Sequence, residues 1–281
     1  MVCSSFAIIL LHTYKRIGGI ILKFEHTEVW GFEHALRGMR LPMNSWSKSD
    51  SVNCDKCTGG SCQYTKPFYH CFGGKGFIAG KNDMELARKL IRAGSEHRKF
   101  MRQIFVSVDI TAPLYWWKEA DTYKVGTTAN STSTMHKLTS QPITMECFET
   151  DDFNPSLESD GLYDGLEYTL GETLVLELFE WLEGLRQRYL ATKDKRYWKE
   201  LIRWLPESWL QTRTITMSYE NVFNMVHQRK NHKLNEWSGI DNPELPNFIA
   251  WAKTLPYAQE LIFIDETEGK NNEQKDRKPV C

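Results

Sequence analysis

The stretch LIRAGSEHRKFMRQIFVSVDITAPLYWWKEADTYKVGTTANSTSTMHKL, from Leu90 to Leu138, decides the fold. It begins in a helix expected over 83–93, where apolar residues recur at helical spacing before Gly94. The segment 102–110 alternates around three β-branched residues, which predicts a half-buried strand. Thr111-Ala112-Pro113 is expected to open a second, aromatic helix, and the polar residues 125–134 are expected to form a loop.

The flanking sequence adds strands and helices on both sides of this stretch. Before it, 22–30 is expected to be a strand, 32–39 a helix, and Asn82 the cap of the helix that follows. After it, an extended segment is expected over 211–217 and helices over 171–190, 195–204, 219–228, 245–253 and 257–263. This mixture predicts an α+β fold, with one domain over 22–265.

Composition limits the classes of function. The chain has 281 residues and a net charge of −1, which gives no strong signal for a sequence-independent nucleic-acid binder. No apolar run approaches the roughly 20 residues of a membrane helix, so we expect no membrane partner and a cytoplasmic location. Residues 1–21 are interpreted as an irregular extension, and the polar residues 266–281 as a disordered tail.

A cysteine-rich loop is expected as an insertion at 48–76. Four of the chain's seven cysteines lie in CDKCTGGSCQYTKPFYHC, namely Cys54, Cys57, Cys62 and Cys71. Four thiolates can hold a tetrahedral zinc ion and so order a loop that has little core of its own. An iron–sulfur cluster and free or oxidised thiols are the alternatives.

Three segments, in the same order, resemble the flavin-dependent thymidylate synthase (ThyX) family. The first is the stretch quoted above, in which a helix, a Gly, a His, a strand, Ala-Pro, an aromatic helix and a polar loop follow one another. The second is WLPESWLQTRTITMSYENVFNMVHQRKNHKLNEW, Trp204 to Trp237, and the third is ALRGMRLPMNS, Ala35 to Ser45. The resemblance implies a ThyX-like fold, with a central, mostly antiparallel sheet packed with long helices.

The resemblance also implies an activity. Members of the family methylate dUMP to dTMP with FAD, a methylene-tetrahydrofolate carbon donor and NADPH, and need no cysteine nucleophile. The expected partner is therefore a pyrimidine nucleotide, and the expected assembly is a homotetramer with sites at subunit interfaces. In such a site the protein supplies positioning and electrostatics while the cofactor carries the chemistry.

Roles follow residue by residue from the resemblance. Arg213 and Arg229 fall on family positions that contact nucleotide or flavin, and they are the expected catalytic residues. The expected cofactor residues are His97, Tyr123, Lys124, Asn130 and His227; the expected substrate residues are Glu119, Thr127, Ser131, Thr132 and Arg213. An arginine fork suits a phosphate or a uracil edge, and a hydroxyl-rich turn can cradle a phosphate. Solvated arginines and an ordinary polar loop are the competing interpretations.

The family's signature motif is altered in this chain. Where the family has Arg-His-Arg followed by Ser, Asn-Glu, Ser and Arg, the chain has Thr122, Tyr123, Lys124, Thr127, Ala129-Asn130, Thr132 and Thr134. Among these positions, only Lys124 keeps the positive charge of the family's residue. A second hypothesis is therefore a catalytically altered relative that binds a nucleotide or a protein without methylating uracil. A third is a small zinc module whose cysteine loop recognises a partner.

Overall fold

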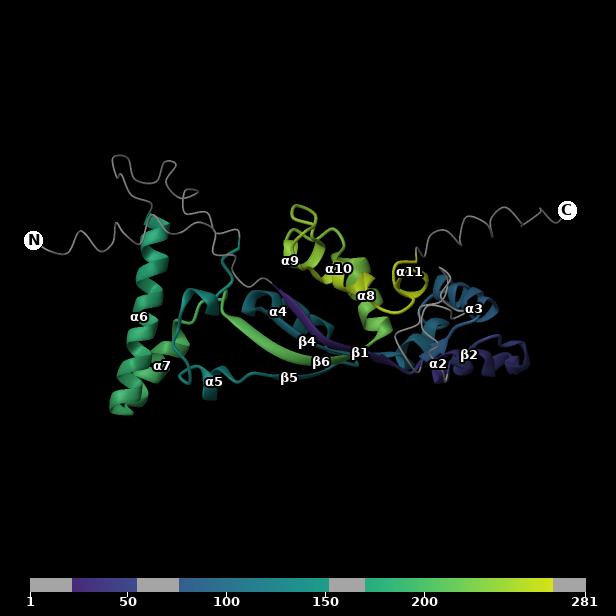
Figure 1. Cartoon of the computed structure of the whole chain (residues 1–281), viewed down its shortest axis with the longest axis horizontal. Helices are drawn as coiled ribbons and strands as arrows, with labels where there is room; N and C mark the ends of the chain where they lie inside the picture. Colours follow the sequence, from purple (N-terminus) through teal and green to yellow (C-terminus); the bar gives the residue numbers. More distant parts are fainter. Residues whose placement is uncertain (1–21, 55–75, 152–169, 265–281) are drawn as a thin grey trace, which may run out of the picture. The chain divides into compact units, whose positions relative to one another are not determined.

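The computed structural model describes residues 22–54, 76–151 and 170–264, whose helices and strands are drawn in Figure 1. The predictions for 1–21 and 266–281 lie outside these residues. Cys57, Cys62 and Cys71 also lie outside them, and of Cys54 only the backbone is described. The expected zinc site therefore stays a prediction.

The chain divides into two compact units, which are described separately. The α6 unit contains Thr111–Ala120 and Ser131–Arg213, and the α8 unit contains Phe24–Ile110, Asp121–Asn130 and the chain from Thr214 onward. Strands β4 and β6 each begin in one unit and end in the other. The expectation of one domain over 22–265 stays a prediction.

Four strands form the main sheet, in the order β1-β4-β6-β5. They are β1 (Lys23–Trp30), β4 (Phe105–Pro113), β5 (Thr128–Ser131) and β6 (Leu210–Ser218). Side-chain hydrogen bonds join Ser107 to Thr216, Asp109 to Thr214 and Thr111 to Thr212. Since the residue numbers rise along β4 while those of the partners fall along β6, these two strands run antiparallel. The expected α+β class with an antiparallel sheet is confirmed.

The α8 unit holds most of the helices. They are α2 (Phe32–Arg40), η1 (Leu41–Met43), η2 (Trp46–Lys48), α3 (Lys81–Arg92), η4 (Arg98–Gln103), η5 (Asp121–Tyr123), α8 (Tyr219–Arg229), α9 (Asn235–Ser238), α10 (Phe248–Lys253) and α11 (Ala258–Leu261). Strands β2 (Val52–Cys54) and β3 (Gly76–Ile78) pair antiparallel beside them. Helix α8 begins in a capping box, in which Ser218 and Asn221 satisfy each other's backbone amides.

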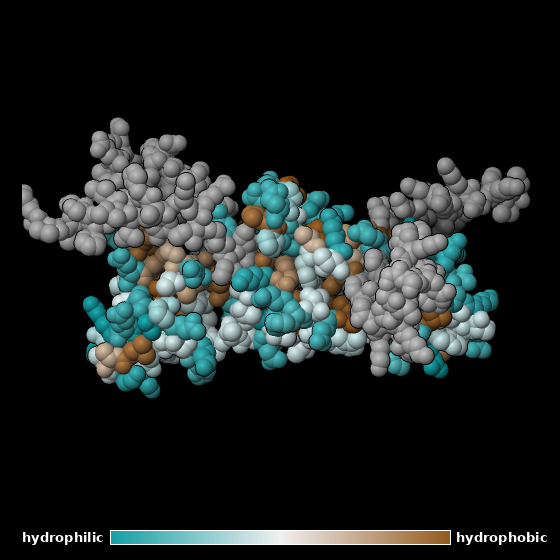
Figure 2. Space-filling view, viewed as in Figure 1, coloured by the Kyte–Doolittle hydropathy of each residue, from teal (hydrophilic) through white to brown (hydrophobic). Residues whose placement is uncertain are grey.

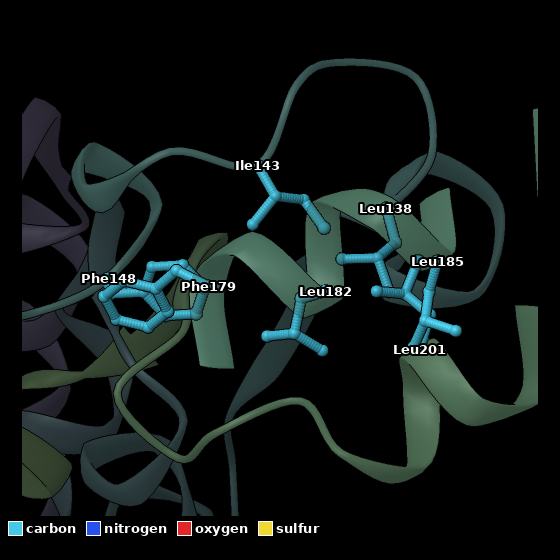
Figure 3. Packing of buried hydrophobic residues seen from close by; sticks show 7 residues of the cluster. All are labelled: Leu138, Ile143, Phe148, Phe179, Leu182, Leu185 and Leu201. Carbon is cyan, nitrogen blue, oxygen red and sulfur yellow. The ribbon is translucent and has the colours of Figure 1, made fainter. Parts of the chain in front are cut away.

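The α6 unit is built on a helical hairpin. Its helices are α4 (Leu114–Ala120), α5 (Thr134–Lys137), η6 (Met145–Cys147), α6 (Leu170–Thr192) and α7 (Lys195–Arg203). Asp194 caps α7 by accepting a hydrogen bond from the amide of Arg196. Figure 3 shows the buried cluster between these helices, in which the rings of Phe148 and Phe179 stack with centroids 4.0 Å apart.

The described surface mixes polar and apolar residues. On the face drawn in Figure 2, the hydrophobic residues form small separate patches between hydrophilic ones. Trp181 on α6 is 43% exposed and packs edge-on against Trp204, which is 53% exposed. Among the described residues, no helix is both long and apolar enough to cross a bilayer.

Most of the expected helices form, but three local predictions need correction. Asn82 does not cap α3, which begins at Lys81; instead the carboxylate of Asp50 accepts the amide hydrogens of Asn82 and Asp83 at 2.9 and 3.2 Å. The strand expected from 102 begins at Phe105, because 98–103 form the 3-10 helix η4. The expected loop 125–134 contains the edge strand β5.

A partly buried ion pair in the α6 unit predicts a pH-dependent stability. Arg186 donates two hydrogen bonds of 2.7 Å to the carboxylate of Glu183, which also accepts the amide of Ile143 at 2.8 Å. These bonds, led by those of Arg186, lower the pKa of Glu183 to about 2. Because the folded pKa is depressed, this stabilisation is present above the ordinary pKa of 4.5 and is lost as the pH falls towards about 2.

We expect Glu183→Gln to lower the free energy of unfolding at pH 7 by on the order of 2 kcal/mol. The difference from the natural protein should shrink as the pH falls from 4.5 towards 3, measured by urea unfolding at each pH. Glu180→Gln on the exposed face of the same helix is the control, with no comparable loss expected. A deficit that stays constant between pH 7 and pH 3 would contradict this assignment.

Candidate functional site

The predicted site residues fall into two groups, one in each unit. The α6 unit holds Glu119, Ser131, Thr132 and Arg213, and the α8 unit holds His97, Tyr123, Lys124, Thr127, Asn130, His227 and Arg229. Each group has its own geometry.

Arg213 on strand β6 is held in place from two sides. Its Nε donates to Oε1 of Gln211 at 2.9 Å, and its guanidinium carbon lies 4.3 Å from the centre of the Trp117 ring. Trp117 is buried on α4, and its indole nitrogen donates to the backbone oxygen of Gln211 at 2.9 Å. The half-buried guanidinium therefore rests on a fixed aromatic face, which restricts its rotamers.

Gln211, which holds this arginine, also contacts the end of β5. Gln211 donates through Nε2 to the backbone oxygen of Thr132 at 2.9 Å, and the amide of Thr132 donates to the carbonyl of Thr212 at 2.9 Å. Ser131 and Thr132 are both exposed at the end of β5. An arginine fork beside exposed hydroxyl groups can bind an anion such as a phosphate.

Glu119 is the remaining predicted residue of the α6 unit. It is half-buried on α4, two residues after Trp117. Its assignment to the substrate stays a prediction.

In the α8 unit, Arg229 and Tyr123 form one hydrogen-bonded cluster. Nε of Arg229 donates to the Tyr123 hydroxyl at 3.0 Å, and that hydroxyl donates to Oε1 of Gln228 at 3.0 Å. The guanidinium carbon of Arg229 lies 5.6 Å from the Tyr123 ring centre and 5.3 Å from that of Trp237. Trp237 is fully buried, so it forms a rigid wall for the arginine.

The segment that carries Lys124 and Thr127 is fastened to helix α8. Nδ2 of Asn221 donates to the carbonyl of Val125 at 2.7 Å, close to Gly126, whose φ is +77°. The Thr127 hydroxyl donates to the backbone oxygen of Lys124 at 3.1 Å, and the Thr127 amide also bonds that oxygen at 3.2 Å. Lys124 itself is exposed, so its ammonium group can reach an anion.

Asn130 and the two histidines have different surroundings. Asn130 is exposed on strand β5, and His97 is exposed just before η4. His227 is half-buried on α8, where its ring lies 4.2 Å from that of Phe223 and its Nε2 is 3.1 Å from the carbonyl of Ile262. These contacts hold the His227 ring in place, and the cofactor assignments of all three residues stay predictions.

Sequence reasoning missed several residues that position the two arginines. They are Gln211, Asn221, Gln228 and Trp237. Only Gln211 had a usable signal: it precedes Arg213 by two, and residues i and i+2 of a strand share a face. Asn221 and Gln228 meet their partners 96 and 105 residues away in the chain, and Trp237 lies eight residues after Arg229, beyond the end of α8, so helical periodicity does not reveal these contacts.

Glu220, another residue missed in the sequence, joins α8 to η4. It is buried and accepts hydrogen bonds from Arg98 and Arg102. Arg98 also lies over the Phe223 ring, with its guanidinium carbon 4.4 Å from the centre. This network fixes the helix that carries His227 and Arg229.

The metal prediction is not tested by the described residues, because the side chains of its four cysteines lie outside them. Among the described residues, no three His, Cys, Asp or Glu side chains are grouped so that they could hold a metal ion. Cys54 ends strand β2 and pairs with Gly76, so the two ends of the cysteine-rich segment are adjacent in a small sheet.

Comparison with solved structures identifies the fold. Flavin-dependent thymidylate synthase ThyX from Helicobacter pylori, complexed with FAD and dUMP, is 14% identical with a TM-score of 0.51, covering 86% of this chain and 98% of its own. A second structure of that enzyme, also with FAD and dUMP, is 15% identical with a TM-score of 0.51, covering 88% and 98%. The UMP/dUMP methylase PolB from Streptomyces cacaoi, bound with 5-Br dUMP, is 12% identical with a TM-score of 0.50, covering 86% and 93%.

No protein-family model matches the sequence, and no curated protein matches it. The likeness to the solved structures nevertheless extends over almost their whole length, in agreement with the order of strands and helices described above. The chain therefore has a ThyX-like fold.

Proposed function

We propose that the protein is a flavin-dependent, thymidylate synthase-like transferase that methylates a pyrimidine deoxynucleotide, dUMP or one with a related base. The proposal is carried by the likeness to enzymes whose structures hold FAD and dUMP, over 98% of their chains. In this reading NADPH and methylene-tetrahydrofolate are the co-substrates, and the assembly is a cytoplasmic homotetramer. Fold alone does not determine function, so the site residues must support it.

Each of the two arginine groups, taken by itself, fits part of a nucleotide. Arg213 is held by Gln211 and Trp117, and Gln211 also contacts the backbone of Thr132; an arginine fixed in this way suits one phosphate group. Arg229 is held between two rings and suits either a phosphate or the carbonyl edge of a uracil. Both positions are pre-organised, so little side-chain entropy is lost when a ligand binds.

The residues near β5 and α8 can also take part in holding FAD. Lys124 is an exposed cation for the pyrophosphate, and Asn130 offers an exposed amide. The bound flavin would supply redox chemistry that none of these side chains provides. The protein's own part is then to orient the nucleotide and to neutralise its charge.

A catalytically altered nucleotide-binding protein is the second candidate. It is favoured by Thr122, Asn130 and Thr134, which stand where the resembled family has Arg, Glu and Arg. Two fewer cations and one fewer carboxylate change both the charge and the hydrogen bonding of the site. Such a protein binds nucleotide but does not turn it over.

The visible absorption spectrum of the purified protein, with FAD and then with added dUMP, tests the proposal. We expect flavin absorbance to co-purify or be retained after desalting, and to shift when dUMP is added. Turnover of dUMP with methylene-tetrahydrofolate and NADPH then distinguishes the enzyme from the altered relative. If the protein retains no flavin after incubation with saturating FAD, the enzymatic proposal is wrong. Calorimetry with dUMP alone would then test the second candidate.

A further inference from the structure

Tyr123 and Arg229 are linked in a way that the sequence resemblance does not imply. The tyrosine stands where the resembled family has a histidine, and its hydroxyl accepts from Nε of Arg229 at 3.0 Å. Gln228 accepts the proton of the same hydroxyl at 3.0 Å, which turns the oxygen lone pairs towards the arginine. The three side chains therefore form a directed chain of hydrogen bonds.

Two aromatic rings fix the remaining freedom of the arginine. The guanidinium carbon lies within 5.6 Å of the Tyr123 ring centre and 5.3 Å of the Trp237 ring centre. The Trp237 ring packs in turn against Phe248, with centroids 5.2 Å apart. A long arginine side chain loses rotamer entropy when it is ordered. In this cluster that cost is met on folding and does not weaken ligand binding.

The backbone around Tyr123 is anchored to the same helix. Asn221, two turns before Gln228 on α8, holds the carbonyl of Val125 at 2.7 Å. The Thr127 hydroxyl donates to the carbonyl of Tyr123 at 3.3 Å. The segment around Tyr123 is thus attached to the first turn of α8 through Asn221 and to its last turn through Gln228 and Arg229. These contacts keep the phenol in place against Arg229.

We propose that Tyr123 is a positioning residue, which orients Arg229 for the nucleotide through the Nε hydrogen bond without touching the ligand itself. This rests on the proposed function, because it takes Arg229 as a residue that contacts the nucleotide. It replaces the expectation that Tyr123 binds the cofactor. In the altered motif, the hydrogen bond from Arg229 to Tyr123 then holds the positive charge of Arg229 in a fixed orientation.

Tyr123→Phe tests this role because it keeps the ring and removes only the hydroxyl. We expect the Kd for dUMP, measured by calorimetry at saturating FAD, to rise about tenfold, since about one charge-assisted hydrogen bond that orders Arg229 is lost. Tyr123→His restores a hydrogen-bonding group and should keep the Kd within about threefold of the natural protein. Tyr189→Phe is the matched control: Tyr189 also faces a cation, Lys193, but lies on α6, and no change is expected.

The arginine Nε–H signal of the ¹⁵N-labelled full-length protein gives a readout that needs no ligand. We expect one slowly exchanging signal, identified by its absence in Arg229→Lys, to exchange faster with solvent in Tyr123→Phe. An unchanged signal overturns the hydrogen bond, and an unchanged Kd with an altered signal overturns its role in binding. If the natural protein binds no dUMP, both the proposed function and the role of Tyr123 in nucleotide binding are wrong. The Nε–H signal still tests the hydrogen bond between Tyr123 and Arg229 in that case.

Discussion

Arg213→Ala is expected to raise the Kd for dUMP by about 10- to 100-fold, because charge-assisted hydrogen bonds contribute about 1.5–3 kcal/mol each. The guanidinium lies over the Trp117 ring and is held by Gln211, so it is already ordered before a ligand arrives. Losing it removes both the positive charge and the two-pronged donor that the guanidinium provides. Calorimetric titration of dUMP at saturating FAD measures the effect.

Two further variants separate charge from geometry. Arg213→Lys keeps the charge but loses the fork and the stacking on Trp117, so an intermediate loss of affinity is expected. Arg196→Ala removes an exposed arginine of the same unit, which pairs with Asp194, and should leave the Kd unchanged. Equal Kd values for Arg213→Ala and the natural protein would exclude Arg213 from nucleotide binding.

Regular periodicity made much of the fold predictable. The alternation around Val106 and Val108 marks strand β4, and the apolar face of the segment 171–190 marks α6. Such patterns arise because one face of a single strand or helix is buried, so they can be recognised from neighbouring residues in the sequence. The α+β class follows from them, whereas the antiparallel sheet was expected from the family resemblance.

Contacts between distant segments were not predictable in this way. The carboxylate of Asp50, and not the side chain of Asn82, accepts hydrogen bonds from the amides in the first turn of α3. Asp50 lies 32 residues before Asn82 in the chain, so a local cap signal does not reveal this contact. The strand β5 consists of exposed small and polar residues, Thr128–Ser131, whose pattern is that of a loop. Its pairing with β6 supplies the backbone hydrogen bonds that local sequence does not specify.

The same distinction separates the parts of the candidate site. Arg213 and Arg229 were identified from the resemblance, which locates residue types along the chain. Their partners Trp117, Gln228 and Trp237 decide the orientation of each guanidinium, and only the folded structure brings them together. Tyr123 illustrates the difference, because a motif comparison identifies its position but not its bond to Arg229.

The largest expected loss of stability comes from Asp83→Asn in the α8 unit. Asp83 is fully buried on α3, and its carboxylate accepts hydrogen bonds from Arg40, Ser49 and Ser51. Burial raises the pKa of Asp83, but the bonds from Ser49, Ser51 and Arg40 outweigh it and leave the pKa below its ordinary value of 3.8. The asparagine would leave the buried guanidinium of Arg40 without an anion, so we expect the free energy of unfolding at pH 7 to fall by about 3–5 kcal/mol.

A double-mutant cycle with Arg40→Met assigns this loss to the ion pair. Methionine fills part of the same space without a charge, so Asp83→Asn should cost much less in the Arg40→Met background than in the natural protein. Since the pKa of Asp83 is depressed on folding, the cost of Asp83→Asn should also shrink as the pH falls below about 3.8. Urea unfolding of the four proteins gives the coupling energy. A coupling near zero would mean that the hydroxyl groups of Ser49 and Ser51, and not Arg40, stabilise the buried carboxylate.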